Sequence, residues 1–203
     1  MKKLLFTIIT VSLVLFISCG KVKAQSGFFT PAEFKLKVQG GFSIANNFGL
    51  FTSVDYFFKP NTFFGIEMHT TALMSQKSES GITVIDLPQD QYTSYMVTVG
   101  KLHTNPNNNK QHVNLKFGLG VVYYDKIIDY IKQNIGPGGF GFFSTYYIYD
   151  PIRESGMTFG MTLDASFQKI GNRLGFMIGP YLNLNLDRPY ASFKIGLIIP
   201  MRK

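Results

Sequence analysis

Residues 113–121 run Val113-Asn114-Leu115-Lys116-Phe117-Gly118-Leu119-Gly120-Val121, and the spacing of their apolar residues is the basis of the fold prediction. Large apolar residues occupy every second position, and polar or small residues lie between them. Successive side chains of a β-strand point to opposite faces, so this spacing predicts a strand with one apolar and one polar face.

The same alternation returns along most of the chain. The segments that carry it are 34–44, 50–58, 64–74, 92–102 (the weakest), 113–123, 157–167, 174–186 and 193–201. A tilted strand needs about 9 to 11 residues to cross a bilayer, which these segments supply. The apolar faces are rich in Phe, Leu, Ile and Met, and the opposite faces combine Gly with Ser, Thr, Asn and isolated charges. Apolar faces suit lipid, and small or polar faces suit a narrow lumen.

We therefore predict an all-β fold, an eight-stranded antiparallel up-and-down transmembrane β-barrel. A soluble barrel with the apolar faces turned inward is the alternative, because sequence alone does not show which face points outward.

The lengths of the connections give a second argument. In a barrel with a periplasmic N-terminus, the even connections are short periplasmic turns and the odd ones lie outside the cell. The even connections, 59–62, 103–111 and 169–173, are short and rich in Pro, Gly and Asn, which tolerate tight turns. The two long connections, 75–91 and 125–155, are the third and the fifth. We expect both on the cell surface.

The N-terminus predicts export. Lys2-Lys3 precede an unbroken apolar run, and Val22-Lys23-Ala24 before Gln25 fits the small-x-small site of signal peptidase. Residues 1–24 are thus expected to be a cleaved signal peptide, and residues 25–203 a single outer-membrane β-barrel domain. Phe16-Ile17-Ser18-Cys19 also resembles a lipobox, in which case Cys19 would carry lipid.

Charge and cysteine content exclude several classes of function. Four of the twenty basic residues and none of the twelve acidic ones precede Gln25, which leaves a net charge of +4 on the mature chain. This excess forms no clustered stripe in the sequence, so a nucleic-acid partner is not expected. Cys19 is the only cysteine, so the mature chain has no disulfide, thiolate catalyst or cysteine metal site. We expect no cofactor and no metal.

The chain resembles the small eight-stranded outer-membrane barrels of the Bacteroidota, the OmpA/OmpX-like and PorT-like group. The resemblance covers the mature chain and rests on aromatic-glycine strands such as 116–120, 179–182 and 193–197. Such families end on an aromatic residue that the insertion machinery recognises, whereas this chain ends in Pro200-Met201-Arg202-Lys203.

The polar faces carry the candidate site residues. We expect a lumen polar network of Asp55, Glu67, His69, Lys116, Asp164 and Lys194. Charges in so narrow a lumen must pair or hold water, so an ion-pair network is the favoured interpretation and a proton relay or catalytic pair the alternative.

Three histidines are available for catalysis. His69 lies on the face of Glu67 but has no nearby serine in a recognisable arrangement, and His103 and His112 flank a periplasmic turn, where we expect solvated residues. The sequence therefore predicts a protein that is not an enzyme.

The fifth connection carries the other candidate signal. Ile127, Ile128, Ile131 and Ile135 recur at helical spacing before a glycine-rich apex, so this segment is expected to be a hairpin or a short helix beyond the membrane. The candidate aromatic surface of this loop consists of Phe140, Phe142, Phe143, Tyr146 and Tyr147. Exposed aromatic residues of this kind suit a protein or saccharide partner.

Together these features predict a non-enzymatic outer-membrane β-barrel, surrounded by outer-membrane lipid, with a role in envelope structure or surface interaction through 75–91 and 125–155. A lipid-A-modifying barrel enzyme and a soluble or lipid-anchored barrel that binds an apolar ligand are the alternatives.

Overall fold

The computed structural model describes residues 34–44, 48–74, 89–137 and 145–202. The predicted signal peptide 1–24, and the part of the 75–91 connection that precedes Gln89, lie outside these ranges. Within them, no helix is long and apolar enough to cross a membrane.

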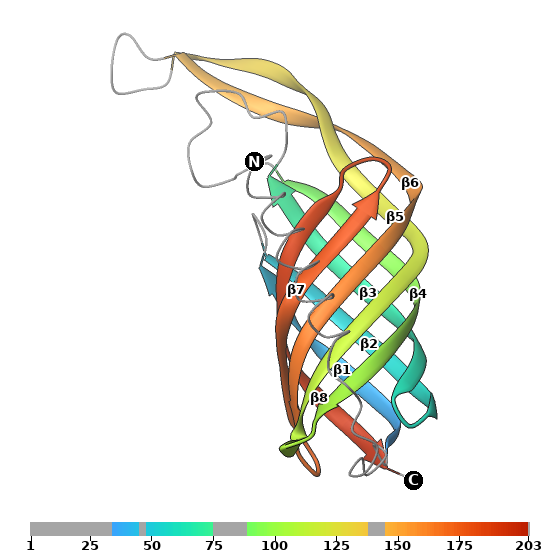
Figure 1. Cartoon of the computed structure of the whole chain (residues 1–203). Coiled ribbons are helices and arrows are strands. Elements are labelled where there is room, and N and C mark those ends of the chain that lie inside the picture. Colours follow the sequence, from blue (N-terminus) through green and yellow to red (C-terminus); the bar gives the residue numbers. More distant parts are fainter. Residues whose placement is uncertain (1–33, 45–47, 75–88, 138–144, 203) are drawn as a thin grey trace, which may run out of the picture.

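The described chain forms a closed, antiparallel, eight-stranded β-barrel in which each strand pairs with its sequence neighbours and β1 pairs with β8 (Figure 1). The strands are β1 Phe34–Ile44, β2 Phe48–Lys59, β3 Thr62–Met74, β4 Gln89–Asn105, β5 Asn108–Pro137, β6 Thr145–Ile170, β7 Gly175–Asn185 and β8 Tyr190–Arg202. This confirms the predicted eight-stranded antiparallel barrel. Closure of the barrel removes the unpaired strand edges that an open sheet of this composition would expose.

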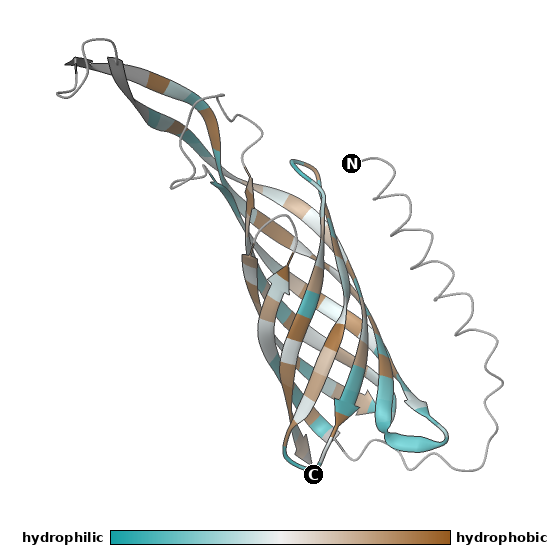
Figure 2. Ribbon diagram, turned by 90° about the vertical axis from the view of Figure 1, so that its left-hand side faces the viewer, coloured by the Kyte–Doolittle hydropathy of each residue, from teal (hydrophilic) through white to brown (hydrophobic). Residues whose placement is uncertain are grey.

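The structure shows which face points outward: most of the large apolar side chains in the described strands are exposed on the outside, and the charged residues of the predicted network are buried inside. In β2 the even positions from Phe48 to Phe58 are exposed, and the odd positions, among them Ser53 and Asp55, are buried. Figure 2 shows hydrophobic residues alternating with more polar ones along the strands of the barrel. This orientation of the two faces is the reverse of a soluble barrel, which would turn its large apolar side chains inward.

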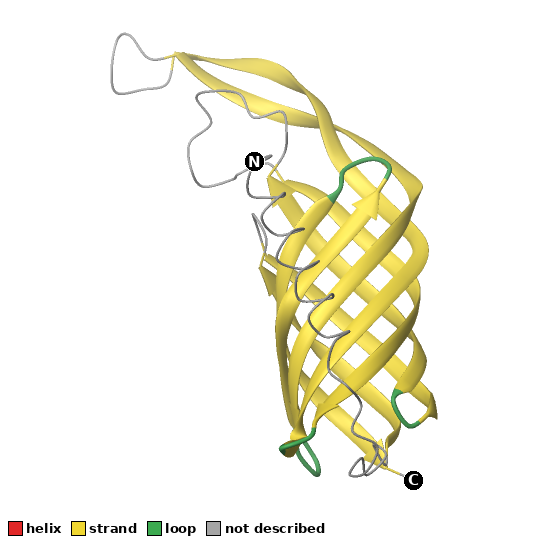
Figure 3. Ribbon diagram, viewed as in Figure 1, coloured by secondary structure: helices red, strands yellow, loops and turns green. Residues whose placement is uncertain are grey.

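Tight turns join the strands at the end of the barrel where the C-terminus lies (Figure 3). β2 and β3 are joined through Pro60-Asn61, β4 and β5 through Pro106-Asn107, and β6 and β7 through 171–174. The second of these turns is tighter than the predicted 103–111 connection, because Asn105 pairs with Asn108.

The fifth connection is the main departure from the expected segment boundaries. β5 and β6 do not end at Asp125 and Ser155 but remain paired with each other as far as Pro137 and Thr145. We call residues 126–137 and 145–154 the β5–β6 extension. It is a β-hairpin arm and not a helix, and it projects beyond the other strands at the end opposite the tight turns (Figure 1).

A register shift in the β5–β6 pairing explains why this part of β5 lacks the period of two that marks a strand in the sequence. The register shifts between Ile127 and Asp129, so two residues of β5 oppose one of β6, as in a β-bulge. A bulge resets the alternation of faces, which destroys the period of two on which the sequence-based prediction relied.

Candidate functional site: the lumen and the outer mouth

The barrel interior is filled by a chain of buried ion pairs. Lys116 Nζ lies 3.2 Å from Asp55 Oδ1 and 3.2 Å from Glu67 Oε2. Lys194 Nζ lies 2.6 Å from Glu67 Oε1 and 3.1 Å from Asp164 Oδ2. The structure therefore brings together five of the six residues expected in the lumen polar network, and all five are buried.

Lys37 belongs to the same chain of ion pairs, although it was not among the expected site residues. Its Nζ lies 3.2 Å from Asp55 Oδ2 and donates to Gln168 Oε1 at 3.2 Å. The signal was present in the sequence, because Lys37 and Gln39 occupy the polar face of the first strand. With Lys37 included, this connected chain of ion pairs holds three lysines and three carboxylates, so their formal charges balance.

Uncharged polar and aromatic side chains surround these ions. Gln39 Nε2 donates to Asp55, and Gln168 Nε2 donates to Gln39 Oε1 at 3.2 Å. Lys194 Nζ lies 3.7 Å from the centroid of the Tyr181 ring, which is within cation–π range. Buried charges are tolerated only when they are paired and hydrogen-bonded, and here these contacts supply that compensation.

The predicted network residue His69 is also buried in the lumen, but its ring nitrogens contact two neutral hydroxyl groups. Its Nε2 lies 2.7 Å from Ser43 Oγ, and its Nδ1 lies 3.0 Å from Tyr190 Oη. The sequence shows no serine in a recognisable arrangement near His69, but the fold brings Ser43 into contact with it. Ser43 and His69 are 26 positions apart in the sequence, and only strand pairing around the barrel brings them together.

This Ser–His contact has the spacing of a nucleophile and its base, but not the access. Both side chains have an exposed fraction of 0%. A reacting carbonyl would have to approach within about 3–3.5 Å of Ser43 Oγ, and surrounding side chains occupy that space. The arrangement suits a structural hydrogen-bond chain from Ser43 through His69 to Tyr190.

The two turn histidines differ from each other. His112 is buried and its Nδ1 lies 3.1 Å from Thr104 Oγ1, so the expectation that it is a solvated turn residue was wrong. His103 is partly exposed. Among the described residues, no group of His, Cys, Asp and Glu is arranged to hold a metal ion.

At the end of the barrel from which the β5–β6 extension projects, a second set of ion pairs surrounds the base of the extension. Lys126 Nζ lies 2.6 Å from Asp187 Oδ1, and Arg188 Nη1 lies 2.9 Å from Asp90 Oδ2. Tyr92 Oη donates to Asp187 Oδ2 at 2.8 Å. We call these five residues the outer mouth cluster. They line a cavity of about 330 Å³ together with Ile127, Ile128 and Glu154.

The electrostatics of this cluster stabilise the charged forms of its members. The hydrogen bond that Lys126 donates to Asp187 raises the pKa of the lysine ammonium. Burial acts to raise the pKa of the Asp187 carboxyl, but the hydrogen bonds from Lys126 and Tyr92 outweigh it and lower that pKa. The ion pair therefore persists through neutral pH and ties the base of the extension to the β7–β8 connection.

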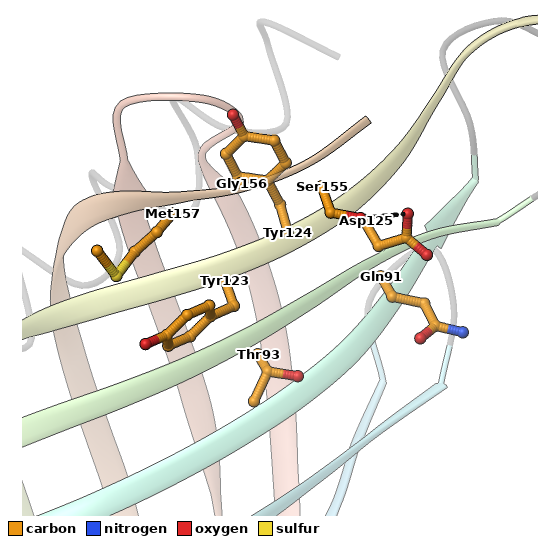
Figure 4. A pocket seen from close by; sticks show the side chains of 8 residues that line it. All are labelled: Gln91, Thr93, Tyr123, Tyr124, Asp125, Ser155, Gly156 and Met157. Atoms are coloured by element: carbon orange, nitrogen blue, oxygen red, sulfur yellow. Dashed lines mark hydrogen bonds between the residues drawn. The ribbon is translucent and has the colours of Figure 1, made fainter. Parts of the chain in front are cut away.

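A second cavity, of about 530 Å³, lies beside β4, β5 and β6 at the base of the extension (Figure 4). It is lined by Gln91, Thr93, Tyr123, Tyr124, Asp125, Ser155, Gly156 and Met157. A Cβ atom at Gly156 would lie 2.4 Å from Tyr124 Oη, so only glycine lets the tyrosine ring lie against β6 here. Ser155 Oγ donates to Asp125 Oδ1 at 3.2 Å.

The expected aromatic surface of the extension falls mostly outside the described structure. Phe140, Phe142 and Phe143 lie in the 138–144 segment, which is not described. Tyr146 and Tyr147 lie in β6, but their side chains are not among those described.

Comparison with known proteins gives similarity in architecture alone. No protein-family model and no curated protein matches the chain. The N-terminal β-barrel domain of Pseudomonas aeruginosa OprF is similar over 82% of this chain and 96% of that domain, with 8% identity and a TM-score of 0.46. The Yersinia pestis outer membrane protein Ail is similar over 83% of this chain and 99% of Ail, with 14% identity and a TM-score of 0.47. Neisserial surface protein A is similar over 83% of this chain and 94% of that protein, with 10% identity and a TM-score of 0.42.

Proposed function

We propose that this chain is a non-enzymatic outer-membrane β-barrel protein that acts in envelope structure or surface interaction, with the β5–β6 extension as its contact arm. The observation that carries the proposal is the sidedness of the barrel wall, which places apolar side chains outside and charged ones inside.

The outer wall suits hydrocarbon and not water. Phe159, Val97 and Ile66 have exposed fractions of 73%, 67% and 66%, whereas Lys37 and Asp55 in the lumen are at 0%. Exposing apolar surface to water costs roughly 25 cal/mol per Å², so a wall of this composition favours lipid. A closed barrel also pairs its backbone groups internally, which a bilayer requires. The expected signal peptide at 1–24 supports export to that membrane.

The filled interior argues against a solute channel. Eight strands leave a lumen just wide enough for side chains, and in this chain large side chains are buried at several levels of it. They include Phe63, Met177 and Ile198 towards the tight turns and Tyr92 and Tyr190 towards the extension. The buried ion pairs of the lumen argue against the alternative of a soluble barrel, because an apolar ligand would have to displace them.

The β5–β6 extension supports a role in contacts beyond the membrane. It continues past the strands beside it, and Ile131 is 52% exposed at a position that β4 does not reach. Apolar side chains on a projecting arm suit a protein or saccharide partner at the cell surface.

Fractionation with a gel-mobility assay tests the membrane assignment. We expect the chain in the outer-membrane fraction, and we expect an unheated sample to migrate faster in SDS than a boiled one because the closed barrel stays folded. A chain that is released in soluble form by osmotic shock and shows no such shift would contradict the proposal.

A photo-crosslinking residue at Ile131 tests the contact arm in intact cells, with the same residue at the opposite-end turn position Asn107 as the matched control. We expect an adduct with a surface protein or saccharide at Ile131 and a different pattern or none at Asn107. Identical patterns would contradict a role specific to the extension.

The Ser43–His69 contact is the one observation that favours the alternative of a lipid-A-modifying enzyme. Mass spectra of lipid A from cells with the chain, without it, and with His69→Ala distinguish the two functions. We expect three identical spectra. A modification that disappears with His69→Ala would establish the enzyme instead.

A further inference from the structure

Of the seven Lys and Arg side chains that are exposed in the described structure, six lie at the end of the barrel where the tight turns are, and Arg153 lies at the other end. The six come from five different strands and one turn: Lys35, Lys59, Lys101, Lys110, Lys169 and Arg173. Figure 2 shows the hydrophilic colour of the turns at this end. We call these six residues the basic rim.

Within the described ranges, no exposed carboxylate accompanies the basic rim. Three described acids, Asp55, Glu67 and Asp164, are buried in the lumen. The other six lie towards the opposite end, near or on the extension: Asp90, Asp125, Asp129, Asp150, Glu154 and Asp187. Among the described side chains, the two ends of the barrel therefore differ in sign, and none of the rim cations forms an ion pair with a described carboxylate.

The rim cations lie at the boundary of the apolar wall. Lys101 follows Val97 and Val99 on the outward face of β4, and all three side chains are exposed. Lys169 follows Phe167 in the same way on β6. A lysine in this position extends its aliphatic stem along the apolar wall and places its ammonium at the level of the lipid headgroups.

We propose that the basic rim binds the anionic headgroups of phospholipids in the leaflet at the tight-turn end of the barrel. This inference rests on the proposed membrane location. Charge complementarity favours a phosphate-bearing surface, and the position of Lys101 and Lys169 on the lipid-facing side favours lipid over a soluble acidic partner. A soluble partner would reach the turn tips but not side chains that lie against acyl chains.

The test measures lipid selectivity at the surface of the folded barrel. The full protein, purified from its membrane and shown to be folded by its gel shift, is reconstituted into phosphatidylcholine bilayers. Spin-labelled phosphatidylglycerol is then compared with spin-labelled phosphatidylcholine by electron spin resonance, which gives the relative association of the two lipids with the protein.

We expect the anionic lipid to be preferred at low salt and the preference to weaken at high salt, because salt screens exposed charges. Lys169→Gln should lower the relative association by up to about fivefold, and a triple variant with Lys101→Gln, Lys169→Gln and Arg173→Gln should abolish it. Arg153→Gln is the matched control, since it removes one exposed cation at the other end and should leave the preference unchanged.

Three results would overturn the inference. A folded, inserted wild-type barrel without anionic preference refutes it while leaving the proposed function intact. An equal loss in Lys169→Gln and Arg153→Gln refutes the assignment to this rim. If the triple variant keeps its lipid preference but no longer sediments with purified peptidoglycan, the rim binds the cell wall instead. A chain that does not insert into bilayers overturns the proposed function itself.

Discussion

Glu67 is the central carboxylate of the lumen, because it joins Lys116 at 3.2 Å to Lys194 at 2.6 Å. Glu67→Gln keeps the shape of the side chain but leaves the chain of ion pairs with one uncompensated positive charge. Breaking a buried ion pair costs about 3–5 kcal/mol. We expect a loss near 3 kcal/mol in the free energy of unfolding, because Lys116 retains Asp55 and Lys194 retains Asp164.

A double variant tests the reasoning. Lys194→Met added to Glu67→Gln restores the charge balance and removes the cation that was left without its shortest contact. Denaturant unfolding in detergent, followed by the gel shift and by circular dichroism, measures Glu67→Gln, Lys194→Met and the double variant. We expect the double variant to lose about 1–3 kcal/mol less in the free energy of unfolding than the sum of the losses of the two single variants. A Glu67→Gln loss below about 1 kcal/mol, or a double variant with purely additive losses, would refute the view that charge balance stabilises the lumen.

Three further predictions concern other parts of the barrel. Gly120→Ala should cost about 1–3 kcal/mol in unfolding experiments because its Cβ would lie 1.9 Å from the Tyr95 carbonyl oxygen, whereas Gly40→Ala, with 3.5 Å of space, should cost far less; equal losses would contradict this. The lowered pKa of Asp187 means that its ion pair stabilises the extension above the unfolded pKa of about 3.9 and is lost as pH falls through the lower folded value. Amide exchange at Lys126 should therefore accelerate only in strong acid, and Asp187→Asn should remove that dependence; an unchanged profile would contradict it. Cysteine at Asp129 should react with an impermeant maleimide on intact cells and cysteine at Asn107 should not; the reverse result would invert the orientation.

The sequence was sufficient for the barrel because its physical cause is local. A narrow lumen demands small or polar residues at every second position, and lipid demands apolar residues between them. The sequence of each strand in the wall therefore alternates with a period of two residues. Asp55, Glu67 and Lys116 were assigned to the inner face on this basis, and the structure places them there.

Features that depend on contacts around the barrel were not predictable in the same way. The Ser43–His69 contact joins β1 to β3, two strands that are not neighbours in the sheet. The bulge after Ile127 interrupts the alternation of faces, so the continuation of β5 beyond Asp125 could not be recognised in the sequence. The basic rim is dispersed over residues 35–173, so no run of charge marks it in the sequence, and only the topology gathers it at one end.

Because the strands differ in length, we expect the backbone hydrogen bonds of this protein to open in two separate units, the barrel wall and the β5–β6 extension. The β4 ladder with β5 ends at Gln91 and Asp125, and the β7 ladder with β6 begins at Gly160 and Asn185. Backbone amides in the barrel wall lie between two bonded neighbours, whereas those of the extension have a partner on one side only. Hydrogen exchange should therefore separate a slow, cooperative barrel from a fast hairpin that melts and re-forms while the wall stays closed. A surface arm of this kind can be lengthened, shortened or replaced with little effect on the stability of the fold that holds it.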